Sequence, residues 1–285
     1  MLLVPGDPLN PRRDDPHFAA QAAAARAAGV PVNRVDHDAL VRATQDNGEA
    51  AAAVAGVPAS EDAVYRGWML SSAQYAALAE ALEARGVHLR TSAEEYRTAH
   101  ELPGWYDALR SVTPESVWTE GSDLVDLVKA ARGLGAGAGV LRDHVKSMKH
   151  HWSEACYLPD VLDDAAVERI GARFLELRDD AFTGGFVVRR FEEFTGAEAR
   201  TWWIGGRCVL TTPHPDTPDE LPTGLDLIEI EPLVAELALP FVTVDVIRRT
   251  DGAWRVVELG DGQVSDWPAT ADPAELVSAL FQPGR

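Results

Sequence analysis

The chain has 285 residues, with 45 Asp and Glu against 26 Lys and Arg, so its formal net charge is −19 at pH 7. Binding to nucleic acid or anionic lipid is driven largely by basic clusters that release counterions, so this charge argues against both as partners. No apolar run spans a membrane and no basic leader opens the sequence, so we expect a cytoplasmic protein in which Cys156 and Cys208 stay reduced.

The first 112 residues alternate between short apolar strands and helices. Strands are predicted at 2–5, 30–35, 64–70 and 87–91, and helices at 19–29 and 72–86. Residues 6–18, GDPLNPRRDDPHF, are predicted to form a loop because prolines and charges interrupt any apolar pattern. This alternation is typical of a small α/β domain.

The rest of the chain divides into a middle segment, 113–193, and a final segment, 194–285. The middle segment is predicted to contain helices at 123–135 and 163–180 and strands at 139–145 and 186–194. In the final segment, two β-rich runs meet at Gly205-Gly206, which predicts a hairpin. Further strands are predicted at 241–250 and 254–260, and helices at 230–238 and 273–281.

Two carboxylates stand in the strands that flank Asp251-Gly252. If these strands pair across that turn, Asp245 and Glu258 are nearly opposite and share a face. Like charges in that position destabilise a hairpin unless a cation lies between them, and carboxylate oxygens suit Mg²⁺. The alternative is a solvated acidic face, but Asp245 lies inside the apolar run FVTVDVI.

Basic residues that are able to neutralise a triphosphate lie upstream. Glu198 and Arg200 are two apart and so share one face of a strand. Two further groups are Arg142, Lys146 and Lys149 in GVLRDHVKSMK, and Arg189 and Arg190 in FVVRRFEEF. Surface ion pairs are the alternative interpretation of each group.

The loop after the first strand carries Arg12 and Arg13, and Arg66 lies in the strand predicted at 64–70. Because open α/β sheets bind ligands beyond the carboxyl ends of their strands, these arginines are candidates for a substrate carboxylate. A proline-stiffened surface loop is the alternative. The Asp36-His37-Asp38 segment is interpreted as a helix-start cap rather than a catalytic pair.

Three segments together resemble the ATP-grasp fold. They are EARTWWIGGRCVL, with its acid-x-Arg pair and glycine hairpin, FVTVDVI with its Asp, and WRVVELGDG, which ends in Glu before glycines. VKSMKHHWSEACYLPD, FTGGFVVRRFEEF and VVELGDGQVSD also resemble the ATP-grasp clade named for two arginines and a lysine. The resemblance implies an α/β (α+β) protein of three lobes: a lead domain at 1–112, a middle lobe at 113–193 and a C-terminal lobe at 194–285.

The resemblance also implies roles for individual residues. Asp245 and Glu258 match the family's metal-binding acids. Asp261 is the predicted third ligand. In the family this ligand is usually an asparagine, and its commonest position corresponds to Gly260 here, one residue earlier. Arg200 matches the arginine that contacts the transferred phosphate. Arg142 stands where a lysine commonly binds phosphates, so Lys146 is its alternative. The remaining nucleotide contacts lie in the hinge strand at 187–193: Arg189, Arg190, Phe191 and Glu193, the last toward the ribose.

The activity implied by the resemblance is ATP-dependent ligation of a small-molecule carboxylate to an amine. ATP and Mg²⁺ are the expected cofactors, an acyl phosphate is the expected intermediate, and ADP and phosphate are the expected products. The alternatives are a phosphotransferase, a ligase that modifies nucleic acid or protein, and a nucleotide-binding protein without chemistry. A homodimer is the expected assembly if the protein is not monomeric.

Overall fold

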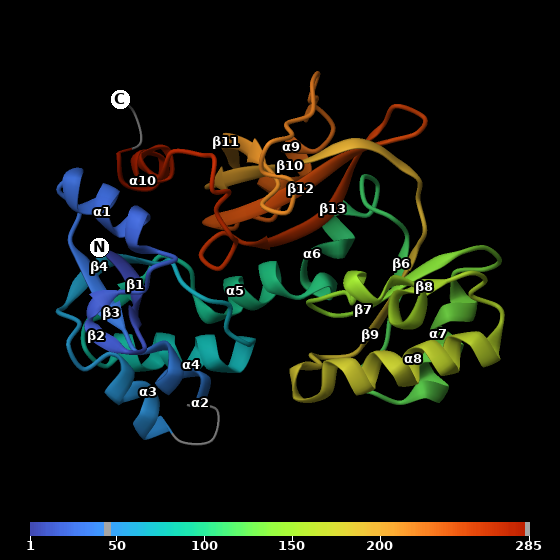
Figure 1. Ribbon diagram of the computed structural model, residues 1–285, viewed down its shortest axis with the longest axis horizontal. Coiled ribbons are helices and arrows are strands. Elements are labelled where there is room, and N and C mark those ends of the chain that lie inside the picture. The colour runs from blue at the N-terminus through green and yellow to red at the C-terminus, as the bar shows by residue number, and fades with distance from the viewer. Residues whose placement is uncertain (43–46, 283–285) are drawn as a thin grey trace. The chain divides into compact units, whose positions relative to one another are not determined.

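The computed structural model describes residues 1–42 and 47–282 (Figure 1). Its packing groups the chain into two units. The first unit comprises Met1–His100, Ala197–Val246 and Glu258–Arg285, and the second comprises Glu101–Gly196 and Ile247–Val257. The division into three consecutive lobes stays a prediction.

The N-terminal part of the first unit is built on one sheet. Its strand order is β2-β1-β4-β5, and β3 also pairs with β1. The strands are β1 (Leu2–Asp7), β2 (Asn10–Asp14), β3 (Val32–Val35), β4 (Ser60–Tyr65) and β5 (Val87–Leu89). The helices are α1 (Ala19–Ala27), α2 (His37–Arg42), α3 (Asn47–Ala53), α4 (Ser72–Glu83) and α5 (Ala93–His100). The alternation of strands and helices expected for a small α/β domain is confirmed.

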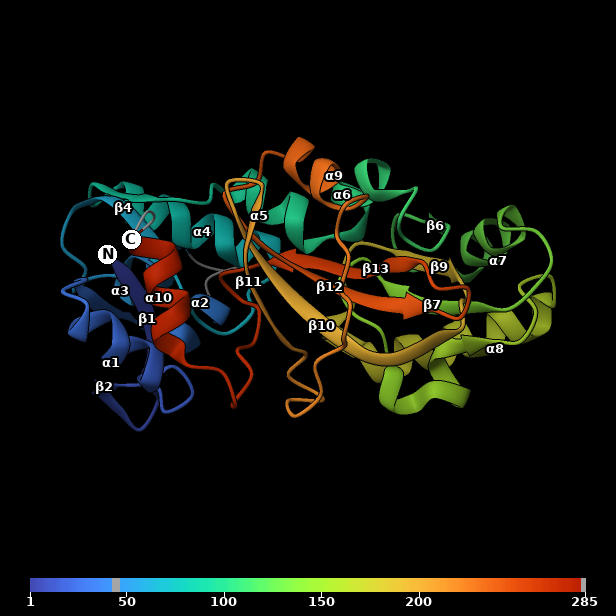
Figure 2. The same cartoon turned by 90° about the horizontal axis from the view of Figure 1, so that it is seen from above.

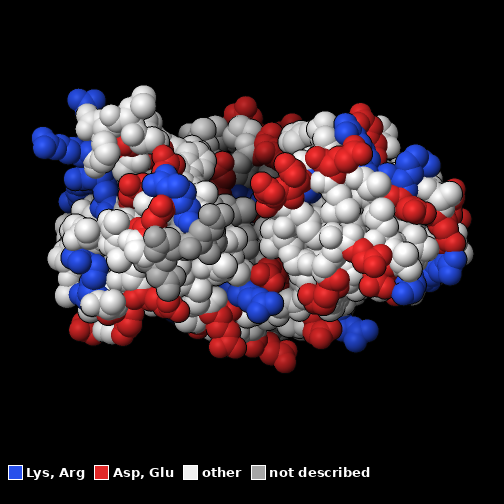
Figure 3. Space-filling view, turned by 90° about the horizontal axis from the view of Figure 1, so that it is seen from below, with Lys and Arg blue, Asp and Glu red and all other residues white. Residues whose placement is uncertain are grey.

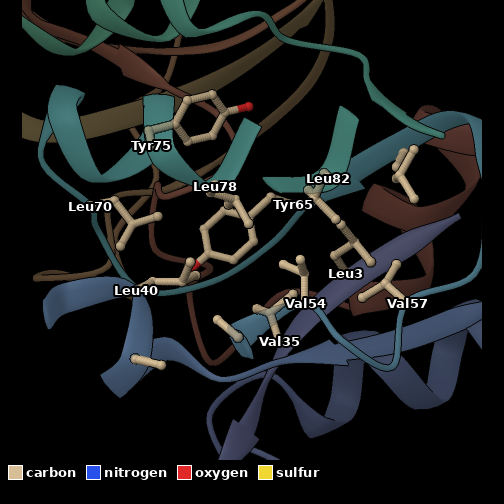
Figure 4. Packing of buried hydrophobic residues seen from close by; sticks show 14 of the residues in the cluster. Leu3, Val35, Leu40, Val54, Val57, Tyr65, Leu70, Tyr75, Leu78 and Leu82 are labelled. Atoms are coloured by element: carbon tan, nitrogen blue, oxygen red, sulfur yellow. The ribbon is translucent and has the colours of Figure 1, made fainter. Parts of the chain in front are cut away.

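Alternate residues of β1 face opposite sides of this sheet, as strand geometry requires. Leu2 and Val4 pack with α1, while Leu3 packs on the other side with residues of α2, α3 and α4. Figure 4 shows that second side, where Leu3 lies among Tyr65, Leu78 and other labelled side chains. The helix α4 begins at a capping box in which the Ser71 hydroxyl accepts from the Gln74 backbone N–H.

The segment predicted as a loop at 6–18 contains a strand. Asp7 Oδ1 accepts hydrogen bonds from the backbone N–H groups of Leu9 and Asn10, at 2.8 and 3.3 Å, and so closes a tight turn. The chain then runs back as β2, antiparallel to β1. The two hydrogen bonds that the Asp7 carboxylate accepts therefore stabilise a turn, and a strand forms where the sequence has no apolar strand pattern.

A second sheet has the strand order β11-β10-β12-β13, and Figure 2 shows β10, β12 and β13 side by side. Its strands are β10 (Phe194–Ile204), β11 (Arg207–Pro213), β12 (Phe241–Arg249) and β13 (Trp254–Asp261), accompanied by α9 (Glu231–Glu236) and α10 (Pro273–Phe281). The predicted hairpin at Gly205-Gly206 is confirmed, since both glycines have positive φ, 55° and 75°, as a two-residue hairpin turn demands. Trp202, Phe241 and Leu276 form part of the core beside it.

The second unit holds a third sheet, ordered β6-β9-β7-β8. Its strands are β6 (Ser116–Trp118), β7 (Gly139–Asp143), β8 (Tyr157–Leu158) and β9 (Phe186–Arg190). Its helices are α6 (Leu102–Leu109), α7 (Leu124–Gly133), α8 (Asp164–Arg178), the 3₁₀ turns η1 (Lys149–His151) and η3 (Asp179–Ala181), and the π-helical turn η2 (Trp152–Cys156). Leu141 of β7 and Val188 of β9 are directly paired and lie in a core with Leu127, Ile170 and Phe174 from the two long helices.

Gly185, just before β9, is required by close packing. A Cβ at this position would lie 1.9 Å from the backbone oxygen of Thr119, which no side-chain rotation relieves. Gly185→Ala is therefore expected to lower the free energy of unfolding by at least about 2 kcal/mol, measured by urea denaturation. At Gly133, by contrast, the nearest atom to a new Cβ is 3.9 Å away, so Gly133→Ala is the control and is expected to keep or raise stability. Equal stability of the two variants would contradict this prediction.

Within residues 1–42 and 47–282, no helix has both the length and the hydropathy needed to cross a membrane. On the face shown in Figure 3, Lys and Arg side chains stand in separate small groups among Asp and Glu.

Candidate active site

Arg200 and Asp245 form the centre of the candidate site in the first unit. Neighbouring strands β10 and β12 carry them, and the guanidinium meets the carboxylate as a fork, with Nε 2.8 Å from Oδ1 and Nη2 2.7 Å from Oδ2. Asp245 is only 3% exposed. Burial alone would raise the pKa of Asp245, but Arg200 and His214 outweigh it and hold that pKa below its ordinary value. The carboxylate is therefore a fixed negative charge inside the fold.

Glu198 and His214 lie against this pair. The hairpin register places Ala199 opposite Pro213, so Glu198 and His214 are adjacent across the strands. His214 Nε2 lies 3.8 Å from Glu198 Oε1, 3.6 Å from Asp245 Oδ2 and 3.2 Å from Arg200 Nη2. Burial, together with the charge of Asp245, raises the pKa of Glu198 to about 7. Two acids, an arginine and a histidine thus share one buried space.

His214 was not among the residues predicted for the site. Its pKa is raised because Asp245 and Glu198 outweigh the effect of burial, which acts in the opposite direction. The sequence feature that could have indicated His214 is the hairpin at Gly205-Gly206. Pairing residues outward from this turn places the residues that follow β11 near Glu198. A bulge between Trp202 and Trp203 shifts the pairing by one residue, so an unbroken ladder would have placed His214 opposite Ala197.

The side chains around Asp245 fit a divalent cation. One ligand atom each from Glu198, His214 and Asp245 lies within 4.8 Å of the others. Glu258 of β13 is half-buried, and its charge raises the pKa values of both Glu198 and Arg200. The two carboxylates of the group suit Mg²⁺ or Mn²⁺, and its imidazole is a common ligand of transition metals.

Asp261, the third predicted metal ligand, lies in a different environment. Among the described residues it does not belong to the ligand group around Asp245. Its Oδ1 accepts from the backbone N–H and the side-chain amide of Gln263, at 2.8 and 3.1 Å, while Oδ2 is buried without a hydrogen-bond partner in the described chain. Burial raises the pKa of Asp261 to about 7.

The predicted phosphate-binding residues of the second unit differ in their contacts. The guanidinium of Arg142 is buried and donates to the backbone oxygens of Asp143 and Val145, at 3.3 and 2.5 Å. Lys146 lies in the turn that follows, where Asp143 Oδ1 accepts its backbone N–H at 2.6 Å. In the part of the chain that the structure describes, no hydrogen bond or ion pair engages the Lys146 ammonium. This arrangement leaves Lys146 the freer of the two to meet a ligand.

The residues predicted for the hinge strand lie on and after β9. Arg189 is buried and donates to the Val257 oxygen at 2.5 Å and to Thr113 Oγ1 at 2.7 Å. Arg190 donates to the backbone oxygens of residues 134–136 and so holds the end of α7. Both guanidiniums thus stabilise the second unit through hydrogen bonds within it.

Phe191 and Glu193 are the other two residues predicted for nucleotide contacts in the hinge strand. Phe191 contacts the Tyr157 ring edge-on, with centroids 5.4 Å apart. Glu193 is exposed, and its backbone oxygen accepts from Thr250 N–H at 3.0 Å.

The three arginines predicted to hold a substrate carboxylate are separated. Arg12 and Arg13 are exposed on β2. Arg66, in contrast, is 1% exposed, and its Nη1 donates to the backbone oxygens of Gly262, Gln263 and Ser265 at 2.5, 3.0 and 2.8 Å. Its Nε donates to Gln21 Oε1 at 2.9 Å. Arg66 therefore fixes the loop that follows β13.

The whole chain resembles solved ATP-grasp structures. The RimK domain protein ATP-grasp from Sphaerobacter thermophilus DSM 20745 is 16% identical, with a TM-score of 0.60 over 98% of each chain. D-cycloserine synthetase DcsG gives the same identity, TM-score and coverage of both chains. Macrocyclase MdnC from Microcystis aeruginosa MRC, bound with precursor peptide MdnA, is 13% identical, with a TM-score of 0.56 over 99% of this chain and 98% of its own. The fold is that of the ATP-grasp class.

The sequence itself specifies the family. The model of the ATP-grasp domain, family 3 of the clade named for two arginines and a lysine, matches residues 131–280, which is more than half of the chain. This protein therefore belongs to that clade of the ATP-grasp superfamily, and the resemblance given by its sequence segments is confirmed. No curated protein matches the sequence.

Proposed function

We propose that this protein is an ATP-dependent carboxylate–amine ligase that releases ADP and phosphate. The observation that carries the proposal is the buried fork between Arg200 and Asp245, with Glu198 and His214 beside it. The fold supports ligase chemistry, since relatives that share it include a synthetase, a macrocyclase and the ATP-grasp ligase PsnB, which was solved with Mg and ADP.

Each acidic residue of the site has a proposed task. Asp245, Glu258 and Glu198 would hold Mg²⁺, which when bound offsets the negative charge of the ATP phosphates. Asp261 stays a predicted ligand. Glu198 is proposed in its place because one of its oxygens lies within 4.8 Å of a ligand atom of Asp245.

Arg200 has a proposed electrostatic role. It is fixed by two bonds to Asp245 and a third from Nη1 to the Asp266 oxygen at 3.0 Å, so its charge needs no reorganisation during reaction. Such a preorganised cation stabilises the charge that develops on a transferring phosphoryl group.

The proposed reaction has two bond-forming steps. A substrate carboxylate oxygen attacks the γ-phosphorus and ADP leaves, which gives an acyl phosphate. An amine nitrogen then attacks the acyl carbon, inorganic phosphate leaves, and the nitrogen releases a proton as the C–N bond is completed. Water must be kept from the acyl phosphate, because hydrolysis would waste the ATP.

The test is to incubate the protein with ATP and Mg²⁺ over a panel of small carboxylates and amines and to measure ADP, AMP and phosphate. ADP and phosphate in equal amounts, dependent on both substrates, is the expected result. Arg200→Met is expected to stop turnover, whereas Arg207→Met, an exposed arginine at the start of β11, is the matched control. AMP release would overturn the proposal, and ADP without phosphate would indicate a phosphotransferase.

Lys146 is proposed to contact the phosphates of ATP. Because a charged hydrogen bond contributes about 1.5–3 kcal/mol, Lys146→Ala is expected to weaken binding of a non-hydrolysable ATP analogue at least about tenfold in calorimetry. Lys129→Ala removes an exposed lysine of α7 that pairs with the neighbouring Asp126 at 2.8 Å, and serves as control. Equal affinity of the Lys146 variant and the wild type would refute this role.

A further inference from the structure

The first unit contains a cavity at one edge of its N-terminal sheet. β1 pairs in parallel with β3 and β4, so these three strands end at the same edge, where open α/β sheets tend to bind ligands. The cavity has a volume of about 350 Å³, which suits a small molecule. Its wall includes the end of β1, the segment from β3 into α2, and Trp68 beyond β4.

The cavity is acidic. Among the residues that the structure describes, four aspartates line it: Asp7, Asp15, Asp36 and Asp38. Its two arginines are engaged elsewhere, since Arg34 pairs with Asp14 at 3.1 Å and Arg42 with Glu49 at 2.9 Å, and neither partner lines the cavity. Burial lowers the pKa of His37 below its ordinary value, so this imidazole adds no positive charge at neutral pH. The field inside the cavity is therefore negative.

An indole forms one wall, and its position is fixed. Trp68 Nε1 donates to Asp15 Oδ2 at 2.9 Å, and the ring packs against His17 with centroids 4.6 Å apart. Asp15 is 7% exposed and also accepts the backbone N–H of His17 at 2.8 Å. Trp68 itself is 41% exposed. A rigid, accessible indole beside carboxylates is the arrangement that attracts an organic cation.

This wall connects to the candidate active site through two residues of the same unit. His17 Nε2 lies 2.6 Å from Asp266 Oδ1, and the backbone oxygen of Asp266 accepts from Arg200 Nη1 at 3.0 Å. The chain of contacts from Trp68 through His17 and Asp266 thus ends on the arginine that pairs with Asp245.

We propose that this cavity binds a small aliphatic amine as its ammonium cation, with Trp68 covering the cation and the aspartates neutralising it. Its assignment as the site of the amine substrate rests on the proposed ligase function. The cavity is opposite in charge to the carboxylate site predicted from Arg12 and Arg13, neither of which lines it.

The binding test uses calorimetry at pH 7.5 and low salt, without ATP, and three probes of matched length. 1,4-Diaminobutane is expected to bind, while 1,4-butanediol and succinate are expected to bind at least tenfold more weakly. Absence of diamine binding at 10 mM, or equal binding of the diol or succinate, would overturn the proposal.

Two variants locate the binding. Asp38→Asn and Trp68→Leu are each expected to weaken diamine binding at least tenfold. The matched controls are Asp219→Asn, an exposed aspartate elsewhere, and Trp152→Leu, a tryptophan 42% exposed in the second unit. Circular dichroism and thermal unfolding check each fold. If Trp68→Leu fails to fold, the exposed Asp38 variant still decides, and unchanged binding by it places the diamine elsewhere.

The two proposals fail separately. Diamine binding in the cavity without ATP turnover on any substrate pair would contradict the ligase function alone. Turnover with an amine that binds equally well to the wild type and to Asp38→Asn would contradict the cavity assignment alone.

Discussion

Glu258→Gln is expected to reduce ATP-dependent turnover at least about 1,000-fold while leaving the fold intact. Loss of a metal-holding carboxylate removes several kcal/mol of charge stabilisation from phosphoryl transfer. Glutamine keeps the size of glutamate, and position 258 is half-buried, so packing around β13 is preserved. Turnover is measured as ADP release at saturating ATP over a range of Mg²⁺ concentrations, with thermal unfolding as the check on folding.

Glu236→Gln, on the exposed side of α9, is the matched control and should leave turnover unchanged. Turnover of Glu258→Gln within fivefold of the wild type would contradict the metal role of this residue.

Measuring ADP release over a range of Mg²⁺ concentrations also distinguishes Glu198 from Asp261 as the third metal ligand. If Glu198 holds the ion, Glu198→Gln raises the Mg²⁺ concentration needed for half-maximal turnover about tenfold or more. Asp261→Asn then leaves that concentration unchanged. The reverse pattern would support the ligand predicted from the sequence.

Asp261→Asn is expected to become more stable relative to the wild type as the pH rises. Burial raises the pKa of Asp261 to about 7, above its ordinary value of 3.8. Between about pH 4 and pH 7, Asp261 therefore keeps its proton in the folded protein but has lost it in the unfolded chain. The stability that this carboxyl contributes is complete below about pH 4 and is lost as the pH rises through about 7. Asparagine carries no titrating proton. The difference in unfolding free energy between Asp261→Asn and the wild type should therefore change by at most about 4 kcal/mol between pH 4 and pH 8.

Urea unfolding of both proteins at several pH values, without Mg²⁺, measures this change. The slope against pH is the readout, because rearranged hydrogen bonds around Gln263 add a cost that does not depend on pH. Asp180→Asn, at an exposed position in η3, should give a curve parallel to the wild type. Parallel curves for Asp261→Asn would show that this carboxyl titrates normally in the folded protein.

Features that depend on near neighbours could be predicted from residue types and their spacing. Gly205-Gly206 predicted the hairpin because two positive φ angles are available there at no steric cost. The apolar run around Asp245 predicted that this carboxylate is buried, and it is. The resemblance to the ATP-grasp clade named for two arginines and a lysine rested on motifs that lie within short segments, and the family match confirms it.

Contacts between side chains far apart in the chain emerged from the folded structure alone. The bulge at Trp202 and Trp203 brings Glu198 opposite His214, and nothing in the residues around either position announces it. The structure also shows that Arg66, a predicted substrate contact, donates to backbone oxygens of the 262–265 loop, which are far along the chain. Residue type and spacing determine local conformation, whereas register, burial and the partner of a charged group depend on the packing of the whole fold.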